Sequence, residues 1–210
     1  MVEITLARHG ETDWNRREIF RGRADIELSE TGTRQAELLA KYLSQAEIAA
    51  VYASPLKRAL KTAEAIASYH SLEVKTAIGL VDLDYGKWQG LPHKKVKERY
   101  PKLYAEWLKN PHRVKIPGGE SLDDVRRRAL GVVDRVTEQH TGKLVLVSYR
   151  VVNKVLICAL LGLDNSHFWN VRQDVSAITT FTYENGRFIL TRHNDTSFLK
   201  AIPTIPLGDF

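Results

Sequence analysis

The sequence predicts an α/β fold in which helices cover both faces of a mostly parallel sheet. Strand-like and helix-like segments alternate along the chain, which is typical of such layered folds. Residues 144–148 form a continuous apolar run, as expected for a strand at the centre of a parallel sheet. Near the C-terminus, Asn185-Gly186 separates two strand-like runs and indicates an antiparallel hairpin. We therefore expect a three-layer α/β/α sandwich whose mostly parallel central sheet has an antiparallel hairpin at its edge.

Residue patterns place the individual elements. Strands are expected at residues 3–8, 50–53, 74–78, 144–148, 177–183 and 187–191. Helices are expected after Gly32, after Ser54-Pro55, over 94–109 with a break at Pro101, from 122 to about 139, and over 151–161. Ser54 and Pro55 are residue types preferred at the N-cap and at the first helical position. Ser121 and Asp124 resemble a capping box, and Gly162 ends the last helix.

The chain is expected to fold as a single domain over residues 1–210. Its length suits one large domain, and no repeat, low-complexity tract or Pro/Gly/Ser-rich linker divides it. The apolar fraction of 43% is ordinary for a globular protein. The tail, residues 200–210, shows no periodicity, and we expect it to pack loosely or to be disordered.

Several features favour a cytoplasmic protein with no membrane partner. No apolar stretch approaches the ~20 residues of a membrane helix. The N-terminus lacks the basic-then-apolar pattern of a signal peptide. The single cysteine, Cys158, excludes an internal disulfide framework, and its apolar helical surroundings predict that it lies in the core.

The net charge of +6 raises the question of acidic partners. The densest basic clusters are residues 93–97 and Arg126-Arg127-Arg128. The arginine run lies in a helical pattern beside Asp123 and Asp124 and has no interleaved aromatic residues. We interpret both clusters as solvated helix faces, which favours a small acidic substrate over nucleic acid.

The residues richest in chemistry are Arg8-His9-Gly10, which directly follow the first strand. In open α/β sheets the carboxyl edge of the strands is where ligands bind. Arg8 supplies a fixed cation, His9 an imidazole able to attack phosphorus, and Gly10 permits close approach of backbone or substrate. This combination indicates an anion pocket with a nucleophile.

Two further stretches complete the chemistry of phosphoryl transfer. Arg58 lies just inside the second helix, where with Arg8 it can grip a phosphate bidentately. The loop 79–90 holds Asp82 and Asp84, either of which can protonate a leaving alcohol. These roles suffice without a metal. Because the remaining histidines lack metal-ligand spacing, we expect no metal and no cofactor.

The motifs in this order resemble the histidine phosphatase superfamily, the phosphoglycerate-mutase-like enzymes, and especially its phosphatase branch. The similarity runs over roughly residues 3–198. It is carried by residues 8–15, 21–32, 53–63, 80–90 and 118–121, which read RHGETDWN, RGRADIELSETG, ASPLKRALKTA, LVDLDYGKWQG and GGES.

The resemblance implies a role for each matching residue. His9 is the nucleophile that becomes phosphohistidine, and Arg8 and Arg58 bind the transferred phosphoryl group. Asn15 assists them, and Arg21 and Gly22 line the substrate side.

The resemblance makes Asp82 the acid that protonates the leaving group and then the base that activates water. The family usually has Glu there, and Asp is one methylene shorter. Asp84 remains the alternative.

One position departs from the family pattern. Tyr149 stands where the family has a second catalytic histidine that stabilises the transition state. A neutral phenol with an ordinary pKa of ~10 cannot supply that charge. Arg150 follows where many members have Gly, and its side chain can restore part of the charge. A single base change converts His to Tyr, and the sequence leaves open whether the residue is natural or introduced.

We therefore expect a metal-independent phosphatase of small phosphorylated metabolites that is impaired by Tyr149. One alternative is a cofactor-dependent phosphoglycerate mutase, although such mutases are usually longer after the acid loop. The other is a non-catalytic pseudo-phosphatase that binds a phosphorylated ligand. The substrate and the oligomeric state are left open, a homodimer being one option.

Overall fold

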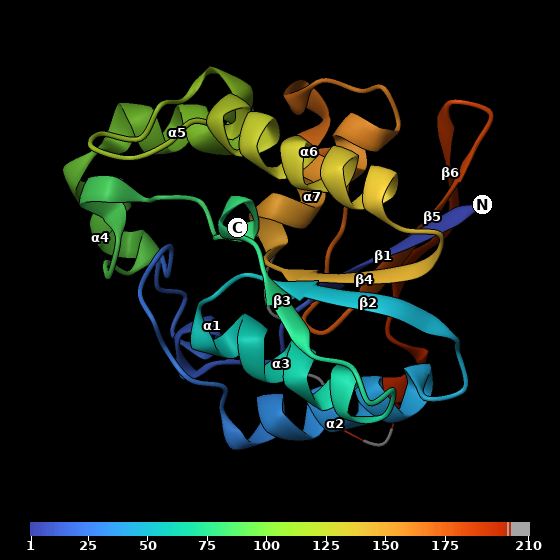
Figure 1. Ribbon diagram of the computed structural model, residues 1–210. Coiled ribbons are helices and arrows are strands. Elements are labelled where there is room, and N and C mark those ends of the chain that lie inside the picture. The colour runs from blue at the N-terminus through green and yellow to red at the C-terminus, as the bar shows by residue number, and fades with distance from the viewer. Residues whose placement is uncertain (201, 203–210) are drawn as a thin grey trace.

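The computed structural model describes residues 1–200 and 202. A six-stranded sheet in the order β3-β2-β4-β1-β5-β6 has helices on both faces (Figure 1). The strands are β1 (Val2–Arg8), β2 (Ile48–Ala53), β3 (Val74–Thr76), β4 (Gly142–Ser148), β5 (Ile178–Glu184) and β6 (Arg187–Asp195). The helices are α1 (Asp13–Arg16), α2 (Glu30–Leu43), α3 (Lys57–Ser68), α4 (His93–Arg99), α5 (Pro101–Lys109), α6 (Leu122–Gln139) and α7 (Arg150–Leu160). The predicted α/β sandwich is confirmed.

Strand pairing brings three strand ends to one edge of the sheet. The central strand β4 pairs in parallel with β1 on one side and with β2 on the other, and β2 pairs in parallel with β3. β5 and β6 add antiparallel strands beside β1, as predicted. Asn185 and Gly186 have φ of +51° and +78°, as their hairpin turn requires. The carboxyl ends of β1, β2 and β4 therefore meet at the same edge.

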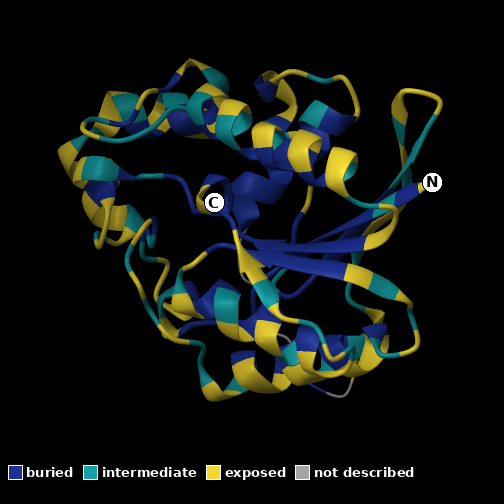
Figure 2. Cartoon of the chain, in the orientation of Figure 1, coloured by how far each residue is buried: buried dark blue, intermediate teal, exposed yellow. Residues whose placement is uncertain are grey.

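Two pairs of helices enclose the sheet. α2 packs with α3 on one face and α6 with α7 on the other (Figure 1). The central strands are buried between the layers, and the outer faces of the helices are exposed (Figure 2). Cys158 in α7 is fully buried, which confirms its predicted place in the core.

Two helix starts differ from the prediction. α2 begins at Glu30, before the expected Gly32, because the side chain of Ser29 accepts a hydrogen bond from Gly32 N (3.0 Å) and caps the helix earlier. α3 begins at Lys57, later than expected, because Ser54 serves a tight turn instead. The Ser54 hydroxyl accepts a hydrogen bond from Leu56 N (3.3 Å), and Leu56 is extended.

The other boundaries lie close to those predicted. β3 ends at Thr76, before the expected residue 78, because Ile78–Leu80 forms a 3₁₀ turn. Pro101 separates α4 from α5, and the capping box of Ser121 and Asp124 begins α6, both as predicted. α7 starts one residue early, at Arg150.

The predictions for the two basic clusters and for the tail compare differently with the structure. Lys94, Lys95 and Lys97 of the first basic cluster are exposed, as predicted. In the second cluster only Arg127 is exposed, so its description as a solvated face is wrong for Arg126 and Arg128. The prediction for the tail concerns residues 200–210, of which residues 201 and 203–210 lie outside the described part, and the described Ile202 is buried. Among the described residues no helix has the length and apolarity needed to cross a membrane.

Candidate active site

The candidate site forms where β1, β2 and β4 end. The His9 amide donates to the carbonyl of Ser148 (3.1 Å), and the Ser54 amide donates to that of Val147 (3.2 Å). These hydrogen bonds continue the sheet by one residue beyond β1 and β2. They place His9 and Ser54 beside the end of β4, where Tyr149 follows Ser148. The sequence prediction that this edge carries the chemistry therefore has a structural basis.

His9 is held as a neutral imidazole with one nitrogen engaged. The side chain is 1% exposed, and its Nδ1 lies 2.6 Å from the carbonyl oxygen of Gly10. A carbonyl can only accept, so Nδ1 carries the hydrogen and Nε2 keeps its lone pair. Burial, followed by the charges of Arg58, Arg8 and Arg21, lowers the pKa of His9 well below its ordinary value. Neutral imidazole is the nucleophilic form.

Gly10 allows the backbone after His9 to lie against helix α2. A Cβ at Gly10 would lie 2.3 Å from the carbonyl oxygen of Gly32. The Gly10 amide also donates to the Thr62 hydroxyl of α3 (3.2 Å), and that hydroxyl donates to the Arg58 carbonyl (2.8 Å). The group that closely approaches Gly10 is therefore the backbone of α2. Through this contact and the hydrogen bond to Thr62, the loop after His9 is held against both α2 and α3.

Arg58 is fully buried and joins several segments of the site. Its Nη1 donates to the carbonyl of Ala24 (2.7 Å), and its Nη2 donates to that of Gly22 (2.8 Å). Nη2 also lies 3.4 Å from Oδ2 of Asp82. The guanidinium carbon is 4.5 Å from the centre of the Tyr149 ring, within cation–π range.

Asp82 and Asp84 occupy different environments. Asp82 is 4% exposed, and its Oδ1 accepts a hydrogen bond from the Leu83 amide (2.9 Å). Burial raises the pKa of Asp82, although Arg58 and Arg21 oppose the shift. Asp84 is more exposed, lies 3.5 Å from Arg23 and accepts from the Gly86 amide. The raised pKa favours a proton on Asp82, as an acid requires.

Arg128, which the sequence interpretation missed, holds the acid loop from behind. Its guanidinium donates to the carbonyls of Gly79 (2.8 Å), Val81 and Asp82 (3.1 Å). It also forms a two-pronged pair with Glu120, at 2.9 and 3.0 Å. The backbone on both sides of the acid is thus fixed by one side chain of α6.

Helical spacing contains the signal that could have identified Arg128. Val125, Ala129 and Val132 form the buried stripe of α6. Arg128 lies three residues after Val125 and four before Val132, so it shares that inward face. Arg127 lies outside the stripe and remains exposed.

Tyr149, which the sequence comparison predicts at the position of the family's second histidine, turns towards β2. Its ring lies 5.3 Å from that of His9, centre to centre. Its hydroxyl donates to Oγ of Ser54 (2.7 Å). Burial raises the pKa of the Tyr149 phenol, so the group is neutral at pH 7. The hydroxyl proton is therefore directed to Ser54, at the end of β2.

The other predicted site residues are anchored around this centre. Arg8 donates to the carbonyl of Gln173 (2.5 Å). Oδ1 of Asn15 accepts from the amide (2.9 Å) and hydroxyl (2.7 Å) of Thr12, so the side chain has its Nδ2 donor to offer a ligand. Gly22 has φ of +50° and contributes through its carbonyl, which binds Arg58.

Comparison with known proteins identifies the family. Residues 4–196 match the model of the histidine phosphatase superfamily (branch 1). The chain belongs to this superfamily. It is 38% identical to phosphoserine phosphatase 1 of Hydrogenobacter thermophilus over 200 residues, which are 95% of each protein.

Solved structures agree with this assignment to the histidine phosphatase superfamily. YhfR of Bacillus stearothermophilus superposes with a TM-score of 0.91 and 29% identity over 95% of this chain and 100% of that chain. A phosphoserine phosphatase mutant of Entamoeba histolytica, solved with phosphoserine, gives a TM-score of 0.84 and 28% identity over 95% and 100%. The resemblance inferred from the motifs is confirmed.

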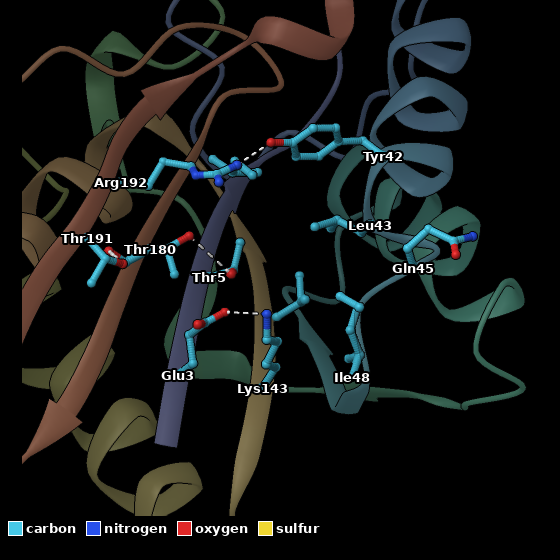
Figure 3. A pocket seen from close by; sticks show the side chains of 13 residues that line it. Glu3, Thr5, Tyr42, Leu43, Gln45, Ile48, Lys143, Thr180, Thr191 and Arg192 are labelled. Atoms are coloured by element: carbon cyan, nitrogen blue, oxygen red, sulfur yellow. Dashed lines mark hydrogen bonds and ion pairs between the residues drawn. The ribbon is translucent and has the colours of Figure 1, made fainter. Parts of the chain in front are cut away.

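Elsewhere this histidine phosphatase has a separate pocket at the opposite ends of the parallel strands. It measures about 410 Å³ and is lined by Glu3 and Thr5 of β1, Lys143 of β4 and Tyr42 of α2, among others (Figure 3). Glu3 pairs with Lys143 there (3.3 Å). Within residues 1–200 and 202, no three His, Cys, Asp or Glu side chains gather as metal ligands.

We expect His9 to stay neutral through the pH range in which an exposed imidazole, with an ordinary pKa of ~6.5, gains its proton, because burial and the neighbouring arginines lower its pKa. Nitrogen-15 NMR of the imidazoles should show an Nδ1–H tautomer that does not change over this range. The His9→Asn variant assigns the signal by its loss. An imidazolium signal for His9 that appears at the ordinary pKa of ~6.5 or above would contradict the neutral site.

Proposed function

We propose that this chain hydrolyses phosphate monoesters of small metabolites through a phosphohistidine at His9, without a metal ion. The observation that carries the proposal is the buried, neutral His9 with Nδ1 engaged, beside two buried arginines. Relatives named phosphoserine phosphatases support it and make phosphoserine the first substrate to test.

In the first step, Nε2 of His9 attacks phosphorus and the P–O bond to the alcohol breaks. Arg8 and Arg58 bind the phosphoryl oxygens, whose negative charge they offset, and Asn15 adds a donor. Asp82 gives its proton to the leaving oxygen, so that the alcohol departs neutral. The products are the alcohol, phospho-His9 and the Asp82 carboxylate.

In the second step, Asp82 accepts a proton from a water molecule that attacks phosphorus. The P–N bond breaks, phosphate leaves and His9 regains its lone pair. We assign this acid and base role to Asp82 instead of Asp84, because Asp82 is buried beside Arg58 and its pKa is raised. The net reaction consumes one water and leaves the enzyme unchanged.

Tyr149 weakens this chemistry in our proposal. Its hydroxyl donates to Ser54, and its neutral ring covers the Arg58 guanidinium. The family's second histidine would contribute a charged donor to the phosphoryl oxygens. A pseudo-phosphatase that binds its ligand without turnover is the second candidate, and the same tyrosine favours it.

Other features of the proposal concern the whole chain. A single sheet includes strands from both ends of the described sequence, which supports one domain. The single cysteine supports a cytoplasmic location. The phosphatase is preferred to a mutase because the relative that matches 95% of both lengths is named a phosphatase.

Tyr149→His is expected to raise kcat/KM for phosphoserine by about 10²–10³, because it restores one donor to the transition state. Steady-state release of phosphate measures the effect. The same replacement at the exposed Tyr69 serves as the control and should leave the rate unchanged. If Tyr149→His gives no gain, position 149 lacks the proposed role. If neither form turns over but both bind phosphoserine, the pseudo-phosphatase is correct.

Asp82→Asn is expected to lower kcat/KM for phosphoserine by about 10²–10⁴, because its alcohol needs a proton on leaving and kcat/KM reports the steps up to that departure. It should have little effect on kcat/KM for 4-nitrophenyl phosphate, whose phenolate leaves without a proton, whereas the second step slows for both substrates. Arg128→Gln should give the same pattern to a smaller degree, since it releases the loop that holds Asp82. Asp84→Asn is the matched control. Equal losses of kcat/KM on both substrates, or a larger loss from Asp84→Asn, would contradict the assignment.

A further inference from the structure

Two more arginines, Arg21 and Arg150, lie beside the proposed phosphoryl pocket. Arg150 is the first residue of α7 and is 9% exposed. Arg21 lies in the segment after α1, and its Nη1 reaches the carbonyls of Trp14 and Ile19 only at 3.4 Å. The buried Nε of Arg21 has no hydrogen-bond partner among the described residues. Donors of Arg21 therefore remain for a ligand.

Arg21 and Arg150 meet at the same aromatic contact, because Phe20, which directly precedes Arg21, packs on the Tyr85 ring at 4.8 Å and Arg150 hydrogen-bonds to Tyr85. Burial, and to a smaller extent the charge of Arg150, lowers the pKa of Arg21 to about 10. Arg21 also lowers the pKa of His9, and both Arg150 and Arg21 lower the pKa of His93 of α4, whose ring stacks on that of Phe20 at 4.0 Å. Arg21 thus lies near both the nucleophile and α4, and Arg150 lies near α4. Two like charges held together in a buried place favour an anion between them.

Arg150 faces away from the position that Tyr149 occupies. Tyr149 hydrogen-bonds to Ser54 at the end of β2, whereas Arg150 donates to the hydroxyl of Tyr85 in the acid loop. The Tyr85 ring packs on Phe20 at 4.8 Å. The consecutive side chains of Tyr149, which caps α7, and Arg150, its first residue, thus point to different sides of the site. This direction argues against Arg150 as a substitute for the family's second histidine.

An anion held by Arg21 and Arg150 must differ from the reacting phosphoryl group. In the proposed function Arg8 and Arg58 bind the phosphoryl group beside His9. The planar forks of two arginines suit a carboxylate, which accepts paired hydrogen bonds. His93 adds no charge at neutral pH, because burial and then Arg150 lower its pKa to about 4.

We propose that Arg21 and Arg150 bind a carboxylate of the substrate and so select phosphate monoesters of small hydroxy acids or amino acids. The inference rests on the proposed function, since it places the carboxylate relative to a phosphoryl group at His9. Neither arginine touches the reacting atoms, and both determine specificity.

Phosphoserine and phosphoethanolamine provide the test, because they differ only by the carboxylate. Arg150→Gln is made in the Tyr149→His background, with Arg135→Gln on the exposed face of α6 as the charge-matched control. The ratio of kcat/KM for phosphoserine to that for phosphoethanolamine should fall about 10- to 100-fold with Arg150→Gln, from loss of hydrogen bonds between charged groups. Arg135→Gln should leave the ratio unchanged.

Two results in this assay would overturn the inference. An equal loss on both substrates would mean that Arg150 serves the phosphoryl group. An unchanged ratio would mean that it binds no carboxylate.

Failure of the proposed function can be distinguished from failure of this inference. If the Tyr149→His form hydrolyses neither ester, the phosphatase proposal is wrong, and binding to the unaltered chain is measured by calorimetry. The inference then predicts at least tenfold tighter binding of phosphoserine than of phosphoethanolamine, and loss of the difference in Arg150→Gln. Equal affinities for the unaltered chain would contradict it.

Discussion

The buried guanidinium of Arg58 is the feature on which the rest of the site depends. It is contacted by the carbonyls of Gly22 and Ala24, by the carboxylate of Asp82 and by the ring of Tyr149. These contacts come from the loop before α2, the acid loop and the end of β4. A buried charge must be surrounded by such partners, because leaving it without them is costly. Fixing one cation in the interior therefore fixes three segments around His9.

Burial among the arginines of the site explains why the individual groups suit the proposed phosphoryl transfer. Arginines near His9 and its burial keep the imidazole neutral, which leaves a lone pair available for attack. Burial has the opposite effect on the carboxyl of Asp82, whose pKa it raises. Arg128 and Glu120 then fix the loop without entering the pocket. In the proposed mechanism, burial thus favours the neutral form of both the proton donor and the nucleophile, and the fold supplies this buried site where three parallel strands end.

Much of this arrangement could be predicted from the sequence, and the reasons for the exceptions are physical. The alternating strand and helix patterns predicted the sheet. The residues that directly follow strands predicted the position of the candidate site, because parallel strands end at a common edge of the sheet. The predicted start of α3 was wrong because Ser54 could either cap a helix or form a turn. Only the folded chain places the Tyr149 hydroxyl against the Ser54 side chain. Arg128 was missed because the arginine run was assessed as a unit, although helical spacing separates its members. The neighbours of Arg150 depend on tertiary contacts that no local pattern encodes.

The most direct test of the account is detection of the phosphorylated histidine. The Tyr149→His form and the unaltered chain are mixed with phosphoserine, quenched in base within the first turnover and digested for mass spectrometry. The account predicts a phosphoryl group on His9 that is stable in base and lost in acid, and that is absent from His9→Asn. It also predicts slower formation in the unaltered chain. Turnover of phosphoserine with no phosphoryl group on His9, or with the group on another residue, would contradict the central claim.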